Sequence, residues 1–251
     1  MLTSRQKYID CTIDEARAAG CDCVQLKYDG WWSRIVIRAG TAMFFSRTER
    51  MYKTIAIKDT SLTCTLIGEH MHGTQWSQHP TRLGQTFIFD CWAWDGQEYE
   101  DIPYVDRYRI ARAALNHLQG EGFTLAANYP IGASEYLWNN EPDFEGLVFR
   151  HSGSEASAPL YRCKRIVTMD LTAISFTEGQ GKFAGTLGAI TAKTPDNVIV
   201  DVGGGFSDAE RQAIWEHRGN YVGQVFEVEA KAKFESGSLR HPNFLRWKEN
   251  E

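Results

Sequence analysis

The sequence predicts an α+β fold in two domains, residues 1–169 and 170–251. Three observations support this prediction. The chain has 251 residues, whereas an average domain has about 150. Its composition, 43% hydrophobic and 24% charged, is that of a globular protein. Runs of β-branched and aromatic residues, separated by glycine-containing turns, outnumber the segments with helical spacing.

The first domain is expected to contain an antiparallel sheet and two helices. Thr12-Ile-Asp-Glu15 has the form of a capping box, and Gly20 is placed to end the helix that follows, so residues 12–19 predict a short helix. Apolar residues at helical spacing predict a second helix over residues 104–118. The predicted strands cover residues 24–29, 33–38, 43–46, 64–71, 86–94, 123–127, 146–150 and 160–166.

The pattern changes after Asp170, where short strands stand in a glycine-rich context. They are predicted at residues 171–176, 185–191, 197–202 and 225–233. One helix begins at Ser207-Asp-Ala-Glu210, which is again a capping box. A segment of about 80 residues with short strands and one helix has the size and element content of a small oligonucleotide/oligosaccharide-binding (OB) barrel. We therefore predict an OB-fold β-barrel for residues 170–251.

The composition also excludes several classes of protein. No run approaches the ~18 apolar residues of a membrane-spanning helix, and the amino terminus lacks the apolar core of an export signal. We therefore expect a cytoplasmic protein of bacterial or phage origin with no membrane partner. The six cysteines are scattered without the paired spacing of a zinc site, so we expect buried free thiols.

The net charge of -5 argues against a phosphate-bearing partner, because a basic field is the usual mark of such proteins. The charge is segregated, however. Residues 34–58 contain six basic side chains and one acid, whereas residues 90–106 contain six acids and no lysine or arginine. One face can therefore be positive. The candidate nucleic-acid-binding residues in the basic segment are Arg34, Arg38, Arg47 and Arg50.

Lys27 stands in the segment Lys27-Tyr28-Asp29-Gly30, where a predicted strand turns toward its partner. A free lysine titrates near ~10.4, so an attacking lysine needs desolvation or neighbouring cations to release its proton. Lys27 is a candidate nucleophile on this reasoning. The alternative is an exposed lysine that precedes a turn.

Five further segments follow Lys27 in order: Phe45-Ser-Arg47, Leu66-Ile-Gly-Glu69, Phe87-Ile-Phe-Asp90, Phe144 to Arg150, and Tyr161-Arg-Cys-Lys164. Their order and spacing resemble the ATP-dependent DNA ligases of the covalent nucleotidyltransferase superfamily. The resemblance covers nearly the whole chain. It implies that residues 1–169 form an adenylation domain, the antiparallel-sheet nucleotidyltransferase fold that is similar to ATP-grasp.

The resemblance implies a set of nucleotide-binding roles. Lys27 takes AMP from ATP as a phosphoramidate, and Gln25 contacts the adenine edge. Arg47 is expected near the ribose or the nick phosphate, with an arginine on a basic strand face as the alternative. Glu69 is expected to bond the ribose hydroxyls. Phe89 is expected to stack on the adenine, although a phenylalanine in an apolar strand is also a common core residue.

The resemblance also implies the groups that handle phosphate and metal. Glu145 stands at the start of a buried strand, where an unpaired carboxylate is costly, so a Mg²⁺ partner is expected. Mn²⁺ is expected to substitute for it. Asp29 is expected to hold metal or to orient a hydroxyl. Arg162 and Lys164 correspond to two cations that hold the α-phosphate, and strand alternation places them on one face.

The second domain carries further matches. The segments 179–189, 202–207 and 238–244 resemble the OB domain of ligases. Arg240, Arg246 and Lys248 resemble the basic terminal motif that closes over ATP and orients pyrophosphate, and the alternative is a solvated basic tail.

Two positions depart from the family pattern. Trp32 stands where the family usually has arginine after its lysine motif, and the nearest arginine is Arg34. Arg162 stands in place of lysine, which keeps the charge and adds a bidentate donor.

The implied function is an ATP-dependent polynucleotide ligase, acting as a monomer, that seals 5′-phosphate/3′-hydroxyl nicks in duplex DNA through lysyl-AMP. One alternative is a ligase that prefers RNA or RNA/DNA hybrid strands, because no residue here reports a 2′-hydroxyl. A second is a capping guanylyltransferase. The non-enzyme alternative is a nucleic-acid-binding OB protein with an inactive first domain.

Overall fold

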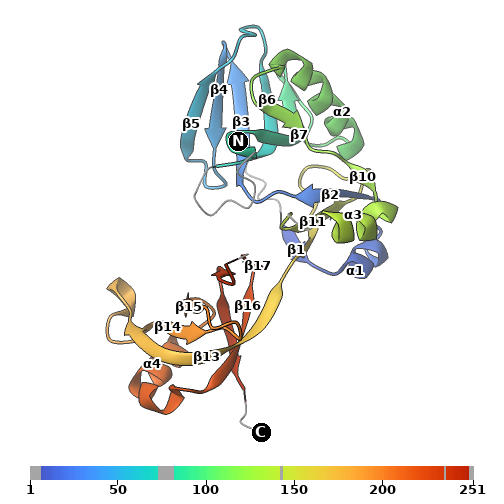
Figure 1. The fold of residues 1–251 in the computed structure, drawn as a ribbon. Helices are drawn as coiled ribbons and strands as arrows, with labels where there is room; N and C mark the ends of the chain where they lie inside the picture. The colour runs from blue at the N-terminus through green and yellow to red at the C-terminus, as the bar shows by residue number, and fades with distance from the viewer. Residues whose placement is uncertain (1–6, 73–81, 142–143, 235, 249–251) are drawn as a thin grey trace. The chain divides into compact units, whose positions relative to one another are not determined.

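The computed structural model describes residues 7–72, 82–141, 144–234 and 236–248 (Figure 1). The chain divides into two compact units, Met1–Lys164 and Arg165–Glu251. The proposed domain boundary between residues 169 and 170 falls inside strand β13 (Val167–Glu178), and the division between units precedes that strand. Within the described residues, no helix is long and apolar enough to cross a membrane.

The first unit contains a five-stranded sheet in the order β1-β12-β11-β2-β10. Strand β1 pairs with β12 in parallel, and the other pairs are antiparallel. Helices α1 and α3 cover this sheet through a core that includes Ala16, Leu137 and Phe149. The bounds are β1 Tyr8–Asp10, α1 Ile13–Ala18, β2 Cys23–Lys27, β10 Tyr129–Pro130, the 3-10 turn η3 Ile131–Ala133, α3 Ser134–Asn140, β11 Gly146–Arg150 and β12 Leu160–Lys164.

A second sheet of the first unit has the order β5-β4-β3-β6-β7-β8, with β9 parallel to β7. Helix α2 lies along this sheet beside β7 (Figure 1), where Ala111 and Leu118 close a core with Ile35, Phe44 and Leu66. The bounds are β3 Trp31–Arg38, β4 Thr41–Phe45, β5 Met51–Ala56, β6 Cys64–His70, β7 Thr86–Trp94, β8 Gln97–Glu98, α2 Tyr104–Leu115, the 3-10 turn η2 Asn116–Leu118 and β9 Phe123–Leu125.

The predicted helices of this unit are confirmed, but several elements were not predicted. In α1, Thr12 accepts from the Glu15 amide, and the Glu15 side chain accepts from the Thr12 amide. Strands β1, β5, β8 and β10 and helix α3 were missed. The prediction of a purely antiparallel sheet is wrong at β1–β12 and β7–β9, because short strands from distant parts of the chain add to the edges in parallel.

The second unit is built on five strands in the order β15-β14-β13-β16-β19, with α4 after β15. An isolated parallel bridge joins Gly204, just after β15, to Asn243 at the start of β19. Within the described residues the sheet is therefore open except at this bridge, so the strands do not form a closed barrel. The bounds are β13 Val167–Glu178, η4 Gly181–Phe183, β14 Leu187–Lys193, β15 Ile199–Val202, α4 Asp208–Glu216, η5 Arg218–Tyr221, β16 Val225–Ala230, β17 Ala232–Lys233, β18 Leu239–Arg240 and β19 Asn243–Trp247.

Helix α4 covers the core of this unit. The predicted capping box is present, because Ser207 accepts from the Glu210 amide and the Glu210 side chain accepts from the Ser207 amide. Buried Arg211 donates to the carbonyl oxygens of Leu187 and Gly203, at 2.7 Å each. The guanidinium thus ties the helix to β14 and to the end of β15.

Candidate active site

A pocket of about 540 Å³, a volume that includes open solvent at its mouth, lies within the first unit. Its walls come from both sheets: β2, β11 and β12 on one side, and β6, β7 and the loop after β4 on the other. The lining residues are Tyr8, Gln25, Leu26, Lys27, Tyr28, Arg47, Glu69, Phe89, Ala126, Val148, Arg150, Leu160 and Arg162.

Lys27 ends β2, directly opposite Gly146 at the start of β11. This register brings the Lys27 Nζ into contact with a Glu145 carboxylate oxygen, to which it donates. The side chains are 18% and 8% exposed, respectively. The pocket therefore holds a largely buried amine in direct contact with a buried carboxylate, which is a group able to accept its proton.

Two glycines allow the strands around Lys27 to come this close. A Cβ on Gly30 would lie 2.5 Å from the His70 carbonyl oxygen, and the Gly30 amide donates to Glu69 Oε1 at 3.2 Å. Gly146 has a φ of +147°, which other residues rarely adopt, and a Cβ there would lie 2.0 Å from the Cys163 carbonyl oxygen. These contacts explain the glycines of the lysine motif and of the segment that follows Glu145.

Burial raises the pKa of Glu69 to about 7, against the lowering effect of the Lys27 and Arg47 charges and of the Gly30 amide. The folded protein therefore keeps a proton on Glu69 at pH values where the unfolded chain has lost it. A carboxyl group of this kind makes folding less favourable as the pH rises from its ordinary pKa to about 7.

Glu69→Gln is expected to be more stable than the wild type at pH 8 but not at pH 5. Glutamine fills the same space and cannot ionise, so the variant does not lose stability as the pH rises from 4.5 to about 7. Its free energy of unfolding at pH 8 is expected to exceed that of the wild type by up to ~3 kcal/mol. Denaturant unfolding at both pH values measures the difference. Glu98→Gln, at an exposed site on β8, is the matched control. An equal stability difference at pH 5 and pH 8 for Glu69→Gln would contradict the assignment.

Arg162 and Lys164 share one carboxylate across the parallel pair β1–β12. Arg162 donates to Asp10 from Nε at 2.5 Å and from Nη2 at 3.2 Å, and the Lys164 Nζ lies 3.4 Å from Asp10 Oδ1. The Arg162 hydrogen bond is the largest cause of the lowered pKa of Asp10. The two cations are thus brought together on one strand face, as alternation predicts.

Tyr8 lies between two arginines at the edge of the pocket. Its ring centroid is 4.9 Å from the Arg47 Cζ and 5.0 Å from the Arg162 Cζ, and its hydroxyl accepts from Arg47 Nη2 at 3.2 Å. Burial raises the pKa of Tyr8 above its ordinary value. The neutral ring therefore separates two like charges that would otherwise repel each other.

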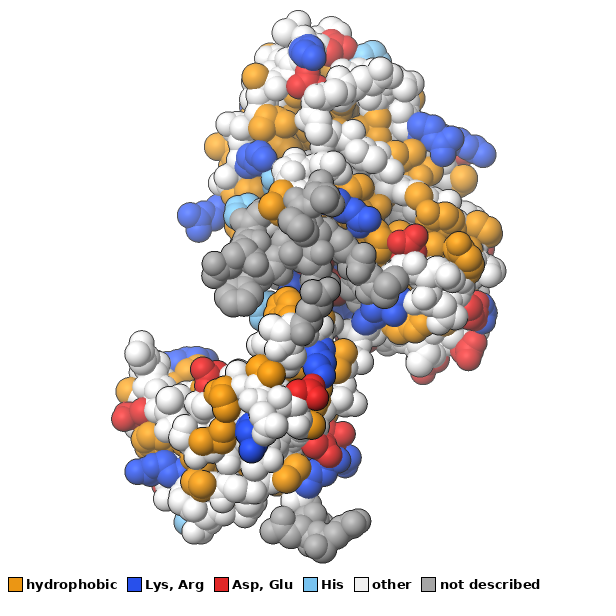
Figure 2. Space-filling model, in the orientation of Figure 1, with side chains coloured by type: hydrophobic (Ala, Val, Ile, Leu, Met, Phe, Trp, Pro, Cys, Tyr) orange, Lys and Arg blue, Asp and Glu red, His pale blue; other side chains and the backbone are white. Residues whose placement is uncertain are grey.

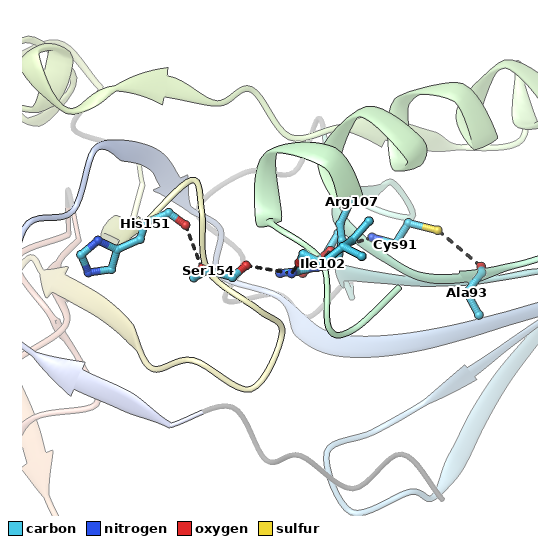
Figure 3. A network of polar contacts seen from close by, with 7 residues as sticks. Cys91, Ala93, Ile102, Arg107, His151 and Ser154 are labelled. Carbon is cyan, nitrogen blue, oxygen red and sulfur yellow. Dashed lines mark hydrogen bonds and ion pairs between the residues drawn. The ribbon is translucent and has the colours of Figure 1, made fainter. Parts of the chain in front are cut away.

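Gln25 and Phe89 line the same pocket. Gln25 is buried and donates from Nε2 to the Ala126 carbonyl oxygen at 3.3 Å. Phe89 projects from β7, and its neighbour Asp90 is held by a buried two-point ion pair with Arg107, at 2.8 and 3.1 Å. The same guanidinium donates to the carbonyl oxygens of Ile102 and Ser154 (Figure 3). This network fixes the strand that carries the aromatic ring.

Several predicted site residues are not brought to the pocket. Arg34 forms an ion pair with Glu49, and its Cζ lies 4.6 Å from the Phe45 ring centroid. Asp29, Glu145 and Lys164 are also absent from the lining, although Glu145 contacts Lys27 and Lys164 lies near Asp10. Four others divide between two locations. Arg38 and Arg50 are exposed on the first unit, whereas Arg246 and Lys248 pair with acidic side chains of the second unit. On the face drawn in Figure 2, basic and acidic side chains are present on both units.

The carboxylates around Lys27 fit a magnesium ion that is shared with phosphates. Within the described residues, no group of three or more histidine, cysteine, aspartate or glutamate side chains is placed to hold a metal. Mg²⁺ usually keeps several waters and binds through one or two carboxylates together with substrate phosphates. Two carboxylates form a donor set of that kind: Glu145, which contacts Lys27, and Asp29, which follows Lys27 by two residues in the sequence.

The comparisons with known proteins bear on the fold of the whole chain and on the family of the second unit. Residues 178–248 match the family described as DNA ligase OB-like domain. No curated protein matches the chain. A Lig E DNA ligase superposes with a TM-score of 0.66 at 18% identity, over 90% of this chain and 92% of its own. The chain has the fold of the ATP-dependent DNA ligases.

Two other solved structures give the same result for the ligase fold. The protein named Pmar-Lig has a TM-score of 0.67 at 18% identity and covers 96% of this chain and 67% of its own. Mycobacterial DNA ligase D, complexed with ATP, has a TM-score of 0.52 at 16% identity, over 100% of this chain and 97% of its own. The similarity to minimal ATP-dependent DNA ligases that the motifs indicated is confirmed.

Tyr8 and Arg150 of the pocket, and Asp10 beside Arg162, are polar residues that were not identified from the sequence as site residues. Tyr8 and Asp10 come from β1, a three-residue strand with no apolar pattern, which reaches the site by pairing with β12. Arg150 ends the predicted strand 146–150, and the sequence pattern assigns it no role. Its position two residues after Val148 on one strand was the available signal, because alternation gives both the same face.

Proposed function

We propose that the protein is an ATP-dependent polynucleotide ligase that seals 5′-phosphate/3′-hydroxyl nicks in duplex DNA through a covalent lysyl-AMP intermediate. The observation that carries this proposal is the buried Lys27 amine in contact with Glu145, in a pocket that is also lined by Arg47, Arg162 and Phe89. The Lig E relative is described as binding DNA with a minimal scaffold, which supports DNA as the substrate.

In the first step Glu145 accepts a proton from the Lys27 ammonium, and Nζ attacks the α-phosphorus of ATP. The bond from this phosphorus to the bridging oxygen breaks, and pyrophosphate leaves. Arg162 and Lys164 stabilise the charge that develops on the nonbridging oxygens. Glu69 orients the ribose, and Arg47 contacts the ribose or phosphate. Arg246 and Lys248 of the second domain are proposed to orient the departing pyrophosphate.

Two further displacements complete the proposed reaction. An oxygen of the nick 5′-phosphate attacks the phosphorus of lysyl-AMP, the Nζ–P bond breaks, and the amine regains a proton. The 3′-hydroxyl then loses its proton and attacks the 5′-phosphorus, and AMP leaves. Asp29 and Glu145 would hold Mg²⁺ or Mn²⁺, which when bound supplies charge neutralisation at the phosphate oxygens. Arg34, which pairs with Glu49, and the exposed Arg38 and Arg50 are proposed to contact the DNA backbone.

Sealing of a nicked duplex tests the proposed function. With ATP and Mg²⁺ we expect a joined product from a 5′-phosphate/3′-hydroxyl nick and none from the same nick carrying a 5′-hydroxyl. All-DNA, all-RNA and mixed nicks are compared in parallel. Sealing confined to nicks with RNA strands would change the substrate class. Binding of these duplexes without any joined product would support a nucleic-acid-binding protein instead.

A further inference from the structure

Tyr8 brings together two cations that come from different sheets of the first unit. Arg162 lies on β12 of the five-stranded sheet, and Arg47 lies in the loop that follows β4 of the second sheet. The Cζ atoms of Arg162 and Arg47 lie over the Tyr8 ring, at 5.0 Å and 4.9 Å from its centroid. All three residues line the pocket. One aromatic ring is therefore a contact that the two arginines share.

Two positive charges at this separation repel each other. Both Cζ atoms are about 5 Å from one ring centroid, so they lie within about 10 Å of each other, which is the Debye length at about 0.1 M salt. Arg162 has a compensating carboxylate, that of Asp10. Among the residues that the structure describes, no carboxylate forms an ion pair with Arg47. Arg47 is held instead by the ring and hydroxyl of Tyr8 and by the Trp32 ring.

The strand register fixes where the Tyr8 ring lies. Strand β1 pairs with β12 in parallel, so that Tyr8 lies opposite Leu160 and Asp10 lies opposite Arg162. Tyr8 and Asp10 are two residues apart and share a strand face. One short strand thus supplies both the ring and the carboxylate that contact Arg162. Burial raises the pKa of Tyr8, so the group beside the two arginines is a neutral phenol and not a tyrosinate.

We propose that Tyr8 is a positioning residue for lysyl-AMP formation, whose ring and hydroxyl hold Arg47 and Arg162 in place for the attack of Lys27 on ATP; this inference rests on the proposed function. The face of an aromatic ring carries negative charge density and attracts a guanidinium. Cations that are already in place need no rearrangement when charge develops on the phosphate oxygens, and this is the condition for electrostatic stabilisation of a transition state. Tyr8 acts through the two arginines and takes no part in the bond changes.

Two substitutions separate the hydroxyl of Tyr8 from its ring. Tyr8→Phe removes the hydrogen bond from Arg47, so the rate of lysyl-AMP formation is expected to fall by about 2- to 10-fold, the range for one net hydrogen bond. Tyr8→Leu also removes both ring contacts and is expected to lose a further factor of about 5 to 30, the range for two cation–π contacts at exposed sites. Single-turnover labelling with α-labelled ATP measures these rates. Tyr136→Leu, at a tyrosine on α3 that is 67% exposed, is the matched control and is expected to label like the wild type.

Removal of the arginines decides whether Tyr8 acts through them. In Arg47→Met, the change Tyr8→Phe is expected to have no further effect on the labelling rate, because the donor to the hydroxyl is gone. Tyr8→Leu is expected to slow labelling less in Arg47→Met and in Arg162→Ala than in the wild type. A ring that serves only the packing of β1 would slow labelling by the same factor in every background. That result would overturn the proposal.

The position of Arg47 is measured separately, without any reaction of ATP. Phenylglyoxal modifies accessible guanidinium groups, and mass spectrometry of the peptides gives the rate at each arginine. The rate at Arg47 is expected to rise in Tyr8→Leu by about 2- to 30-fold, the range for one cation–π contact from an exposed to a desolvated site. Arg50, which is exposed in the same loop, is the internal standard. Tyr136→Leu is expected to leave the rate at Arg47 unchanged.

An unchanged rate of modification at Arg47 in Tyr8→Leu would overturn the proposal whatever the labelling shows. If Tyr8→Leu does not fold, as judged by thermal melting, Tyr8→Phe serves in both measurements and is expected to give a smaller change in the same direction. A raised rate at Arg47 in a protein whose wild type forms no adduct with ATP would instead reject the proposed function. The role of Tyr8 in holding Arg47 would then stand by itself.

Discussion

Lys27→Ala is expected to abolish labelling of the protein by ATP that carries ³²P at the α-phosphorus, by more than about 10³-fold. No substitute nucleophile is available, because Lys27 is the sole lysine among the described residues that line the pocket. Loss of a covalent nucleophile removes the step itself rather than one contribution to its rate. Denaturing electrophoresis measures the label, and mass spectrometry of the peptides locates the adduct.

Two further variants separate loss of chemistry from loss of fold. Lys27→Ala leaves the Glu145 carboxylate without its lysine, and breaking a buried ion pair can cost several kcal/mol. Lys27→Arg keeps a cation there and is also expected to remain unlabelled. Lys58→Ala, at a side chain that is 84% exposed, is expected to label like the wild type. Label retained by Lys27→Ala, or absent from the wild type, would reject the lysyl-AMP mechanism.

The sequence predicted the parts of the pocket that local patterns determine. Strand β7 begins and ends at the predicted residues 86 and 94, and β11 at the predicted residues 146 and 150. Alternation along β12 also placed Arg162 and Lys164 on a common face, where both now meet one carboxylate. These predictions succeed because side chains alternate between the two faces of a strand and glycines mark the turns, and both features can be read from local sequence.

The parts that were missed depend on contacts between distant segments. Asp10 meets Arg162 across 152 positions of sequence, and no property of residues 8–10 alone indicates a strand or a partner. The prediction of a basic face from the charge pattern was also incomplete. Residues 34–58 are rich in arginine, yet Glu49, the one acid among them, turns back to pair with Arg34. The ring centroid of Trp32 lies 5.8 Å from the Arg47 Cζ. The cation beside position 32 is therefore Arg47, which comes from the loop after β4.

The other large effect is expected at Arg162, which replaces the usual lysine of the family pattern. Arg162→Ala is expected to lower the rate of lysyl-AMP formation by about 10² to 10³-fold, the range for removing one group that stabilises developing charge. Arg162→Lys keeps the charge but loses the two-point contact with Asp10, and we expect a loss of less than about 10-fold. Single-turnover labelling with α-labelled ATP measures these rates.

Asp10 provides the test of how Arg162 acts. Asp10 faces solvent and is 63% exposed, so it is expected to position the guanidinium rather than to contact the nucleotide. Asp10→Ala should therefore slow adenylation in the wild-type background and have little further effect in Arg162→Ala, since residues in one network are not additive. Lys164 also lies near Asp10, and Lys164→Ala in both backgrounds separates its contribution. Fully additive losses of adenylation rate for Asp10→Ala and Arg162→Ala would contradict this role. They would mean that Asp10 does not position the Arg162 guanidinium.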